Sequence, residues 1–460
     1  MIFVAKNERH FISIDVGTTN LKISVFSSEY VFLDKHHYSY TNIVVDECRY
    51  ELDFAEIWQA IRDGIEELIV RNRIVQADII LTTAMHSVQL LEEDFRLTGP
   101  LLVWSDKRGA EFVQQSSMRS LERRYRISGT PNHSMNPFYK LKSLQNDLDG
   151  KRIGSLKDVI FYQLTGKWAT DRASAASSGL YDLSSHRWSE ALLAELNVDS
   201  RQLPEIKKPD FCLNVREHLF PILKEGKVYI GTTDGVSSNY AFSTLERTAV
   251  LSIGTSHAVR VVTDKPCLNF ETQNFCYEIT DGKYLVGYPS NNGGNVLAWI
   301  LEAFQMDWDE LNVLLKVQPA TTGVFLPFIN GERAPVWNDS LKAQLVHLDR
   351  RVNRKSLIYT MVCGVIFNIK HNVDNLSQLF PFERIGLVGG VTKSKEMCQL
   401  IADILGYEVF VPKTPQAETL GSLALVKGIK GETDFTTYTP KQSFTKEYEQ
   451  YLQVFQQYIK

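Results

Sequence analysis

A short sequence pattern occurs twice in this chain, about 240 positions apart. The first copy reads IDVGTTNLKISV (Ile14 to Val25) and the second reads LSIGTSHAVRVV (Leu251 to Val262). Each copy has an apolar strand, a Gly-Thr-Thr or Gly-Thr-Ser turn and an alternating second strand, which predicts a β-hairpin. A single Gly-Thr turn is common in β-rich chains, so the prediction depends on the pair. Two matched hairpins predict two related halves that each present a turn to a shared cleft.

The rest of the chain alternates between strand-like and helix-like segments. Between Phe54 and Ile69 apolar residues recur every three or four positions, which predicts a helix with one buried face. Between residues 384 and 413 a short apolar strand precedes a helix that Ser394 would cap and Gly406 would end. This alternation is typical of an α/β fold with parallel strands. A length of 460 residues predicts roughly two or three domains.

Composition excludes several classes of protein. The net charge of -4 argues against a general nucleic-acid binder, because phosphate-backbone affinity needs a concentrated basic face. No apolar run approaches the length of a membrane span, and the N-terminal residues lack the apolar core of a signal peptide. The six cysteines form no C-x-x-C pair, so neither a zinc site nor a disulfide framework is indicated. We therefore expect a cytoplasmic protein whose partners are small molecules.

The two glycine turns have the chemistry of phosphate-binding loops. A glycine turn exposes backbone N–H groups, and neighbouring hydroxyls add donors, so a polyphosphate can bind there. Lys22 would place a positive charge beside a transferred phosphoryl group. Asp15 would repel that phosphate unless it faces a cation, most simply hydrated Mg²⁺; the alternative is an acid that caps the turn. The second copy has Ser252 in place of the acid, so only the first half is expected to hold metal.

Asp234 is the candidate general base. It follows an apolar strand and precedes Gly235, a position from which a strand end projects its side chain into a cleft between domains. A carboxylate that accepts the proton of an attacking hydroxyl contributes about 10² to 10⁴ in rate. Asp-Gly is also a common turn dipeptide, and the position just before the second phosphate turn favours the catalytic interpretation.

Taken together, DVGTTNLK, SIGTS, GTTDGVSSN, VGGVTKS and AETLGSLALV resemble the ordered motifs of the FGGY family of carbohydrate kinases, over nearly the whole chain. The resemblance implies an α/β, duplicated actin/Hsp70-like (ribonuclease H-like) two-domain fold with an interdomain active-site cleft. It implies an N-terminal domain over 1–240 and a C-terminal domain over 241–460. It also implies ATP and Mg²⁺ as cofactors, and a phosphotransferase that acts on an alcohol group.

Site residues follow from the same resemblance. Asp234 would be the catalytic base and Asp15 the metal ligand. The phosphate-binding residues would be Gly17, Thr18, Thr19, Asn20, Lys22, Gly254, Thr255 and Ser256, and the nucleotide-binding residues Gly294, Gly389, Gly390 and Ser394. Ser394 stands where some members of the family have asparagine, so the preference for adenine stays open.

Within the family, GERAPVWN (Gly331 to Asn338) and the setting of Asp234 resemble gluconate kinases, which implies phosphorylation of the 6-hydroxyl of D-gluconate. Substrate-binding residues would be Met85, His86, Trp104, Asp106, Arg108, Lys140, Asp234 and Arg333. The carboxylate of gluconate needs a cation, for which Lys140, Arg108, Arg333 and His86 are the candidates.

Structural interpretations compete for several of these residues. His86 could be a core histidine, Lys140 a solvated charge and Trp104 a packing residue. Glu332 and Arg333 could form an ion pair that shapes the loop. A further departure from the family pattern is DSLKAQLVHL after GERAPVWN, which lacks an Arg-Gly that often follows there.

Other functions also stay open. One is a xylulokinase or another polyol or ketose kinase, and one is a catalytically silent sensor of sugar or nucleotide. The amphipathic stretch from Tyr448 to Ile459 would pack into the core or form a homodimer.

Overall fold

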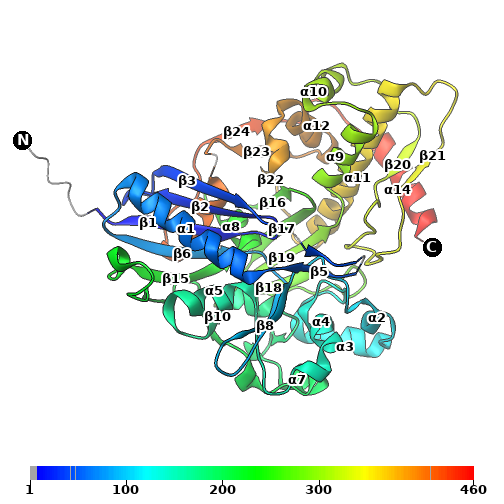
Figure 1. The fold of residues 1–460 in the computed structure, drawn as a ribbon. Coiled ribbons are helices and arrows are strands. Elements are labelled where there is room, and N and C mark those ends of the chain that lie inside the picture. The colour runs from blue at the N-terminus through cyan, green and yellow to red at the C-terminus, as the bar shows by residue number, and fades with distance from the viewer. Residues whose placement is uncertain (1–7, 42, 47, 415, 460) are drawn as a thin grey trace, which may run out of the picture.

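The computed structural model describes residues 8–41, 43–46, 48–414 and 416–459. Its elements form two lobes, each built around a mixed β-sheet that carries helices (Figure 1). The first sheet belongs to the N-terminal lobe and the second to the C-terminal lobe, as the sequence predicted for a duplicated α/β fold.

The first sheet has the order β14-β15-β6-β1-β2-β3. Its strands are β1 (His10–Val16), β2 (Asn20–Phe26), β3 (Phe32–Ser39), β6 (Ala77–Thr83), β14 (Cys212–Asn214) and β15 (Lys227–Thr233). Strands β1, β6 and β15 are parallel to one another, and β2, β3 and β14 are antiparallel to their neighbours.

The second sheet has the order β18-β19-β17-β16-β22-β23-β24. Its strands are β16 (Thr248–Ile253), β17 (His257–Thr263), β18 (Phe275–Thr280), β19 (Lys283–Ser290), β22 (Arg384–Val388), β23 (Glu408–Pro412) and β24 (Phe435–Tyr438). Here β16, β22 and β23 are parallel, and β17, β19 and β24 are antiparallel to their neighbours.

The two sheets therefore share one topology. Reading β14-β15-β6-β1-β2-β3 against β24-β23-β22-β16-β17-β19 matches both the strand order and the direction of every pair. The repeated hairpins occupy equivalent positions, β1–β2 and β16–β17. The duplication predicted from the two short stretches is confirmed.

Matching helices follow the strands in both lobes. They are α1 (Phe54–Asn72), α5 (Leu156–Thr165) and α8 (Asp234–Tyr240) in the first, and α11 (Arg354–Leu379), α12 (Lys395–Leu405) and α13 (Ala417–Lys427) in the second. Helix α1 begins at Phe54 as predicted, after the N-cap Asp53. Ser394 caps α12, and Gly406 ends it in a left-handed conformation.

Helices α8 and α13 pack against each other between the two sheets. A Cβ atom on Gly421 would lie 1.8 Å from the carbonyl oxygen of Ser237, so the close approach of the two helices requires glycine at this position. Tyr240, which marks the predicted domain boundary, is the last residue of α8.

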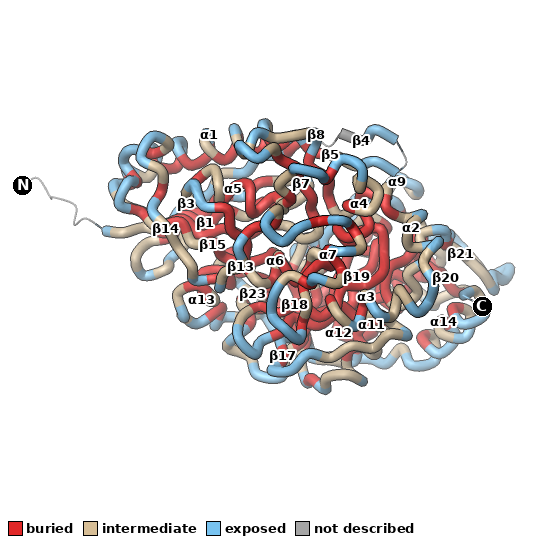
Figure 2. Tube along the Cα trace, turned by 90° about the horizontal axis from the view of Figure 1, so that it is seen from below, coloured by how far each residue is buried: buried red, intermediate tan, exposed pale blue. Residues whose placement is uncertain are grey.

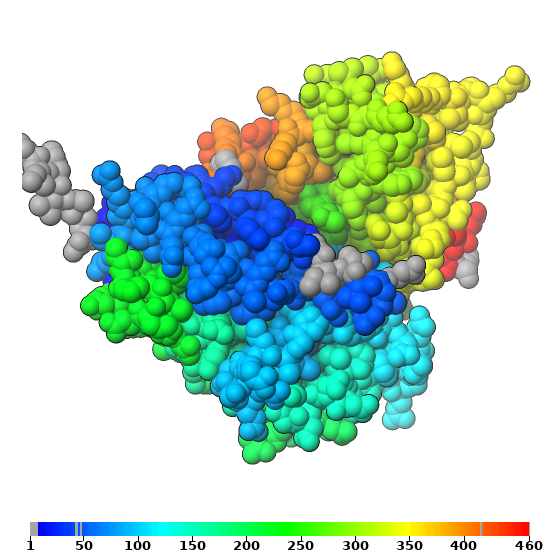
Figure 3. Space-filling model, viewed as in Figure 1, coloured from blue at the N-terminus to red at the C-terminus, as the bar shows by residue number. Residues whose placement is uncertain are grey.

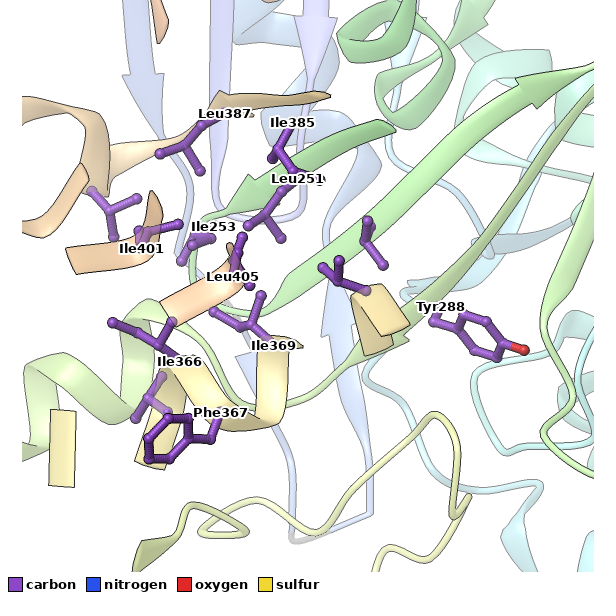
Figure 4. Close-up of a cluster of buried hydrophobic side chains, with 14 of the residues drawn as sticks. Leu251, Ile253, Tyr288, Ile366, Phe367, Ile369, Ile385, Leu387, Ile401 and Leu405 are labelled. Atoms are coloured by element: carbon purple, nitrogen blue, oxygen red, sulfur yellow. The ribbon is translucent and has the colours of Figure 1, made fainter. Parts of the chain in front are cut away.

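Each sheet has its own buried core. Figure 2 shows buried residues along the strands and exposed residues on the outer helices and loops. In the second lobe the side chains of β16 and β22, such as Leu251 and Ile385, meet those of α11 and α12, such as Ile369 and Leu405 (Figure 4). Burial of so much apolar surface fixes the position of the strands whose ends form the site.

Smaller elements decorate the two lobes. A further sheet has the order β4-β5-β8-β7-β9, and three two-stranded sheets pair β10 with β13, β11 with β12, and β20 with β21. These strands are β4 (Ile43–Val44), β5 (Tyr50–Leu52), β7 (Val88–Leu91), β8 (Leu97–Leu102), β9 (Arg152–Gly154), β10 (Ala169–Asp171), β11 (Tyr181–Asp182), β12 (Arg187–Trp188), β13 (Glu205–Lys207), β20 (Val324–Leu326) and β21 (Gln344–Val346). Further helices are α2 (Ala110–Gln114), α3 (Met118–Ser128), α4 (Pro137–Ser143), α6 (Arg172–Ala176), α7 (Glu190–Leu196), α9 (Gly294–Ala303), α10 (Trp308–Val317) and α14 (Thr445–Tyr458), with short 3₁₀ turns at 145–147, 200–202, 221–223 and 390–393.

The C-terminal helix α14 packs internally through Tyr448, Tyr451 and Phe455, which are buried in the core of the second lobe. None of the helices among the described residues is both long and apolar enough to cross a membrane. The six cysteines are unpaired.

Candidate active site

A cavity of about 420 Å³ lies between the two lobes, and residues of both halves line it. Figure 3 shows the N-terminal lobe, in blue to green, and the C-terminal lobe, in yellow to red, as two masses that face each other. The sequence-predicted residues that line this cavity are Asp15, Gly17, Thr18, Thr19, Asn20, Lys22, Met85, His86, Trp104, Asp234, Gly254, Thr255, Ser256, Arg333, Gly389 and Gly390.

The first glycine turn joins β1 to β2 at one wall of the cavity. Val16 pairs with Leu21, so four residues, from Gly17 to Asn20, make the turn. The Gly17 N–H donates to the carbonyl of Asn20 at 2.9 Å. Lys22 is exposed on β2 directly opposite Asp15, so its ammonium group is available to an anion in the cavity.

The second glycine turn joins β16 to β17 at the opposite wall. Ile253 pairs with His257, so this turn has three residues, from Gly254 to Ser256. The second turn is therefore one residue shorter than the first. Because of this difference the structural counterpart of Lys22 is Ala258, which pairs with Ser252, whereas an ungapped overlay of the two stretches would have placed Val259 there.

Of the residues predicted to bind nucleotide, Gly389 and Gly390 line the cavity, whereas Gly294 and Ser394 do not. Gly389 has a φ of 101°. A Cβ atom at Gly389 would lie 2.2 Å from the carbonyl oxygen of Ile253. Gly294 lies behind the second turn, where its N–H donates to the Gly254 carbonyl at 2.8 Å. Ser394 is buried away from the cavity wall, where its hydroxyl caps α12 and donates to Asn312 Oδ1 at 2.5 Å.

Asp15 lines the cavity together with two other carboxylates, Asp234 and Glu418. Burial raises the pKa of the Asp15 carboxyl to about 7; Lys22 opposes this rise, and the negative charges of Asp234 and Glu418 add to it. A divalent cation would hold Asp15 ionised, so the residue fits the metal role. Among the described residues no three His, Cys, Asp or Glu side chains form a metal-binding group. A Mg²⁺ ion here would therefore depend on phosphate and water for its other ligands, as this ion usually does.

Asp234 is the first residue of α8, directly after β15. A register shift between Tyr229 and Thr232 occurs where Gly231 adopts a φ of 66°, and this bulge re-aims the end of the strand. Asp234 Oδ1 accepts the N–H of Gly235 at 2.7 Å. Burial raises the pKa of Asp234, and the positive charge of Arg260 is the largest effect that opposes the rise.

His86 and Tyr277 lie together on the cavity wall. The His86 Nδ1–H donates to the Ser177 carbonyl at 2.8 Å, which leaves Nε2 as an acceptor 3.5 Å from the Tyr277 hydroxyl. Burial, reinforced by the charge of Lys140, lowers the pKa of His86 to about 3, so the ring is neutral at physiological pH. The side chain is a candidate hydrogen-bond partner for a sugar hydroxyl.

Three predicted substrate ligands do not reach the cavity. Asp106 is fully buried and binds the Arg108 guanidinium, which also pairs with Glu51 at 2.6 Å. Lys140 is fully buried as well, and its Nζ donates to the carbonyls of His86 and Met135 at 3.2 and 2.6 Å. Asp106 and Arg108 therefore form an ion pair outside the cavity wall, and Lys140 supports the backbone at His86.

Arg333 lies at the cavity wall, with its guanidinium 4.8 Å from the ring centroid of Trp104. The adjacent Glu332 is fully buried and accepts hydrogen bonds from Ser290, Asn292 and Asn368, and from the backbone N–H of Arg333. These contacts make Glu332 an organiser of the loop.

Two charged residues of the wall were not predicted from the sequence. Arg260 lines the cavity from β17, and Glu418 lines it from the first turn of α13. Arg260 had a readable signal, because it is a charged residue among valines in the second repeat. Glu418 stands inside a stretch whose role came from resemblance alone, and nothing in that stretch predicts that α13 crosses to the first lobe.

The arrangement has the parts needed for phosphoryl transfer. Both donor-rich turns line the cavity, and so do Lys22, the carboxylates Asp15 and Glu418, and Asp234. Such a site can neutralise and align a polyphosphate while a carboxylate accepts a proton from an attacking hydroxyl.

Comparison with known proteins agrees with this geometry. Residues 10–219 match the N-terminal domain of the FGGY family of carbohydrate kinases, and residues 249–426 match its C-terminal domain. A gluconokinase of Bacillus subtilis is 28% identical, covering 97% of this chain and 94% of the relative. Two solved structures from Lactobacillus acidophilus, a ligand-bound xylulose kinase and a gluconate kinase, match with TM-scores of 0.90 and 0.89 at 27% and 28% identity, each covering 98% of this chain and 97% of the other.

Proposed function

The chain belongs to the FGGY family of carbohydrate kinases, and from this premise we propose that it transfers the γ-phosphate of ATP to the 6-hydroxyl of D-gluconate. Membership makes the chain a phosphotransferase with an alcohol group as acceptor, so the alternative of a silent sensor is not retained. The observation that carries the proposal is the meeting of both glycine turns and Asp234 at one cavity.

In the proposed reaction Asp234 accepts the proton of the sugar hydroxyl as it attacks the γ-phosphate. The N–H groups and hydroxyls of the turns, from Gly17 to Asn20 and from Gly254 to Ser256, bind the phosphates from opposite lobes. Lys22 neutralises charge on the transferred group. The nucleoside lies toward Gly389 and Gly390, with Gly294 supporting the second turn from behind.

Asp15 is the residue proposed to hold Mg²⁺, with Glu418 nearby as a further carboxylate. The ion, when bound, supplies positive charge to the phosphate oxygens. What the chain contributes is a partly buried carboxylate opposite Lys22, and closure of the lobes would exclude water from the transferred group.

For the substrate, the proposal places the sugar against Met85, His86, Trp104 and Asp234, with Arg333 as ligand of the carboxylate. Arg333 is favoured among the four predicted cations because it alone combines a positive charge at physiological pH with a position on the cavity wall. The gluconokinase and gluconate kinase relatives support gluconate as the substrate. A xylulose or other polyol kinase is the second candidate, supported by the likeness to the solved xylulose kinase.

A coupled assay of ADP release tests the proposal. Purified protein with ATP and Mg²⁺ is given gluconate, xylulose, ribulose or glycerol, and kcat/KM is compared. The proposal expects gluconate to lead by at least tenfold. A lead for xylulose would transfer the function to the second candidate, and no ADP release with any sugar would contradict both.

A further inference from the structure

Arg260 is a buried arginine whose hydrogen bonds are incomplete. It projects from β17 into the cavity wall and is 9% exposed. One terminal nitrogen, Nη1, donates to the Ser252 hydroxyl at 2.8 Å. Its Nε is buried and has no hydrogen-bond partner in the described structure. A buried donor without a partner is costly, so this N–H indicates a missing acceptor.

Arg333, which follows β20, is a second buried arginine whose hydrogen bonds are incomplete. It is 6% exposed; Nη2 donates to the Ser290 carbonyl at 2.6 Å, and Nη1 lies 3.6 Å from the sulfur of Met135. Its Nε is also buried without a partner among the described residues. The hydrogen-bond partners of both guanidinium groups among the described residues are thus neutral atoms, although each group carries a full charge. Carboxylates act on these charges without accepting a hydrogen bond from them: Asp234 and Glu418 on Arg260, and Glu332 and Asp339 on Arg333.

The two guanidinium groups belong to the wall of one cavity. The charge of Arg260 lowers the pKa of Arg333, after burial and against the opposing effect of Glu332, and both arginines act on the Tyr277 hydroxyl. Arg260, Arg333 and Tyr277 all line the same cavity. Two like charges removed from water repel each other and lose hydration. An anion that accepts from both would compensate both costs.

We propose that Arg260 and Arg333 together bind the carboxylate of an acidic sugar, so that Arg260 is a second specificity residue of this site. The inference rests on the proposed kinase function and narrows its substrate to the aldonic acids. It also explains why a neutral sugar would bind poorly, since it would leave two buried cations unpaired.

Arg260 has a competing role that the test must separate. Its guanidinium lies beside Gly235, where a Cβ atom would be 2.9 Å from Nε, and its charge acts on Asp234. Asp234 also faces Lys157, Lys22, Asp15 and Glu418. If Arg260 only supported Asp234, its loss would slow every sugar equally. If it also binds the carboxylate, its loss would penalise acidic sugars more than neutral ones.

D-gluconate and D-gluconamide form the matched substrate pair, because they differ only in the terminal group, which is a carboxylate in one and a neutral amide in the other. We compare the native protein with Arg260→Met and Arg333→Met. The control is Arg384→Met, which removes a half-buried arginine of the same lobe that donates to the Glu246 carbonyl. Circular dichroism and a thermal melt check that each variant is folded, and Arg260→Lys replaces Arg260→Met if that variant does not fold.

We expect Arg260→Met and Arg333→Met each to lower kcat/KM for gluconate by about 30-fold or more, mainly through KM. The loss of kcat/KM for gluconamide should be at least about tenfold smaller than the loss for gluconate, and Arg384→Met should leave the ratio of the two substrates unchanged. An equal loss on both substrates would overturn the proposal and assign Arg260 to Asp234 alone.

Calorimetric binding of gluconate, without nucleotide, separates this inference from the proposed function. Binding that the native protein shows and Arg260→Met loses supports the carboxylate site even if turnover is absent. Efficient phosphorylation of xylulose with no binding of gluconate would keep the kinase and refute the arginine pair.

Discussion

Replacement of Asp234 by asparagine is the sharpest test of the proposed chemistry. Asparagine has nearly the same shape, and its side-chain oxygen can still accept the Gly235 N–H that Asp234 Oδ1 accepts at 2.7 Å. The substitution therefore removes the proton acceptor while it preserves the start of α8. We expect phosphoryl transfer to be lost and the fold to be kept.

The expected magnitude follows from the role of the residue. A positioned general base contributes about 10² to 10⁴ in rate, which corresponds to about 3 to 5 kcal/mol of activation free energy. Burial raises the pKa of Asp234, so the ionised carboxylate costs stability in the folded protein. The melting temperature of Asp234→Asn should therefore equal or exceed that of the native protein.

Three measurements belong together: kcat from coupled ADP release, the Kd for ATP from calorimetry, and the thermal melt. We expect kcat to fall by at least about 10²-fold while the Kd for ATP changes by less than about threefold, because Asp234 lies on the sugar side of the site. A variant that is folded, binds ATP and retains more than a tenth of the native kcat would refute the assignment of the base.

Other perturbations test the supporting structure. Lys22→Met should lower kcat/KM for ATP by about 10- to 100-fold, through loss of a charged contact to phosphate, with no change in the melt because Lys22 is exposed. Burial lowers the pKa of Lys140 from 10.5 to about 7. Between these two pH values the unfolded chain therefore binds more protons than the folded protein, so the free energy of unfolding should rise with pH by up to about 1.4 kcal/mol per pH unit. Lys140→Met should remove that slope in urea denaturation at several pH values. Gly231→Ala should cost about 2 to 5 kcal/mol in the same assay, because Gly231 has a φ of 66° and the new Cβ would lie 1.8 Å from the Leu81 carbonyl oxygen; a loss below 1 kcal/mol would show that the bulge beside Asp234 is not constrained.

The local elements of the fold could be predicted from the sequence because short-range rules govern them. The helix starting at Phe54 and the cap at Ser394 depend on periodicity and on one side-chain hydrogen bond. The duplication was visible because both hairpins kept their glycine turns. Each of these signals lies within about a dozen consecutive residues.

The parts of the site that sequence missed depend on contacts between distant segments. Arg108 looked like a substrate ligand, but it pairs with Glu51 from β5, 57 positions away along the chain. Arg260 stands out as a charge among valines, but a charge in a strand does not show which cavity its side chain faces. Glu418 reaches the site only because α13 packs against α8. Long-range packing of this kind leaves no periodic trace in the chain.

The two hairpins differ in the charged residues they carry. This difference suggests why one lobe is proposed to bind metal and the other to bind the carboxylate of the substrate. In the first hairpin Asp15 is opposite Lys22, so a carboxylate and an ammonium group lie together beside the glycine turn. In the second hairpin Ser252 is opposite Ala258, and the basic residue is Arg260, two positions further along the same face. Two strand residues span about 7 Å, so the backbone of Arg260 lies further from the glycine turn than the position equivalent to Lys22. The Ser252 hydroxyl, which replaces the acid, accepts from that arginine without neutralising it, so its charge stays available for an anionic substrate.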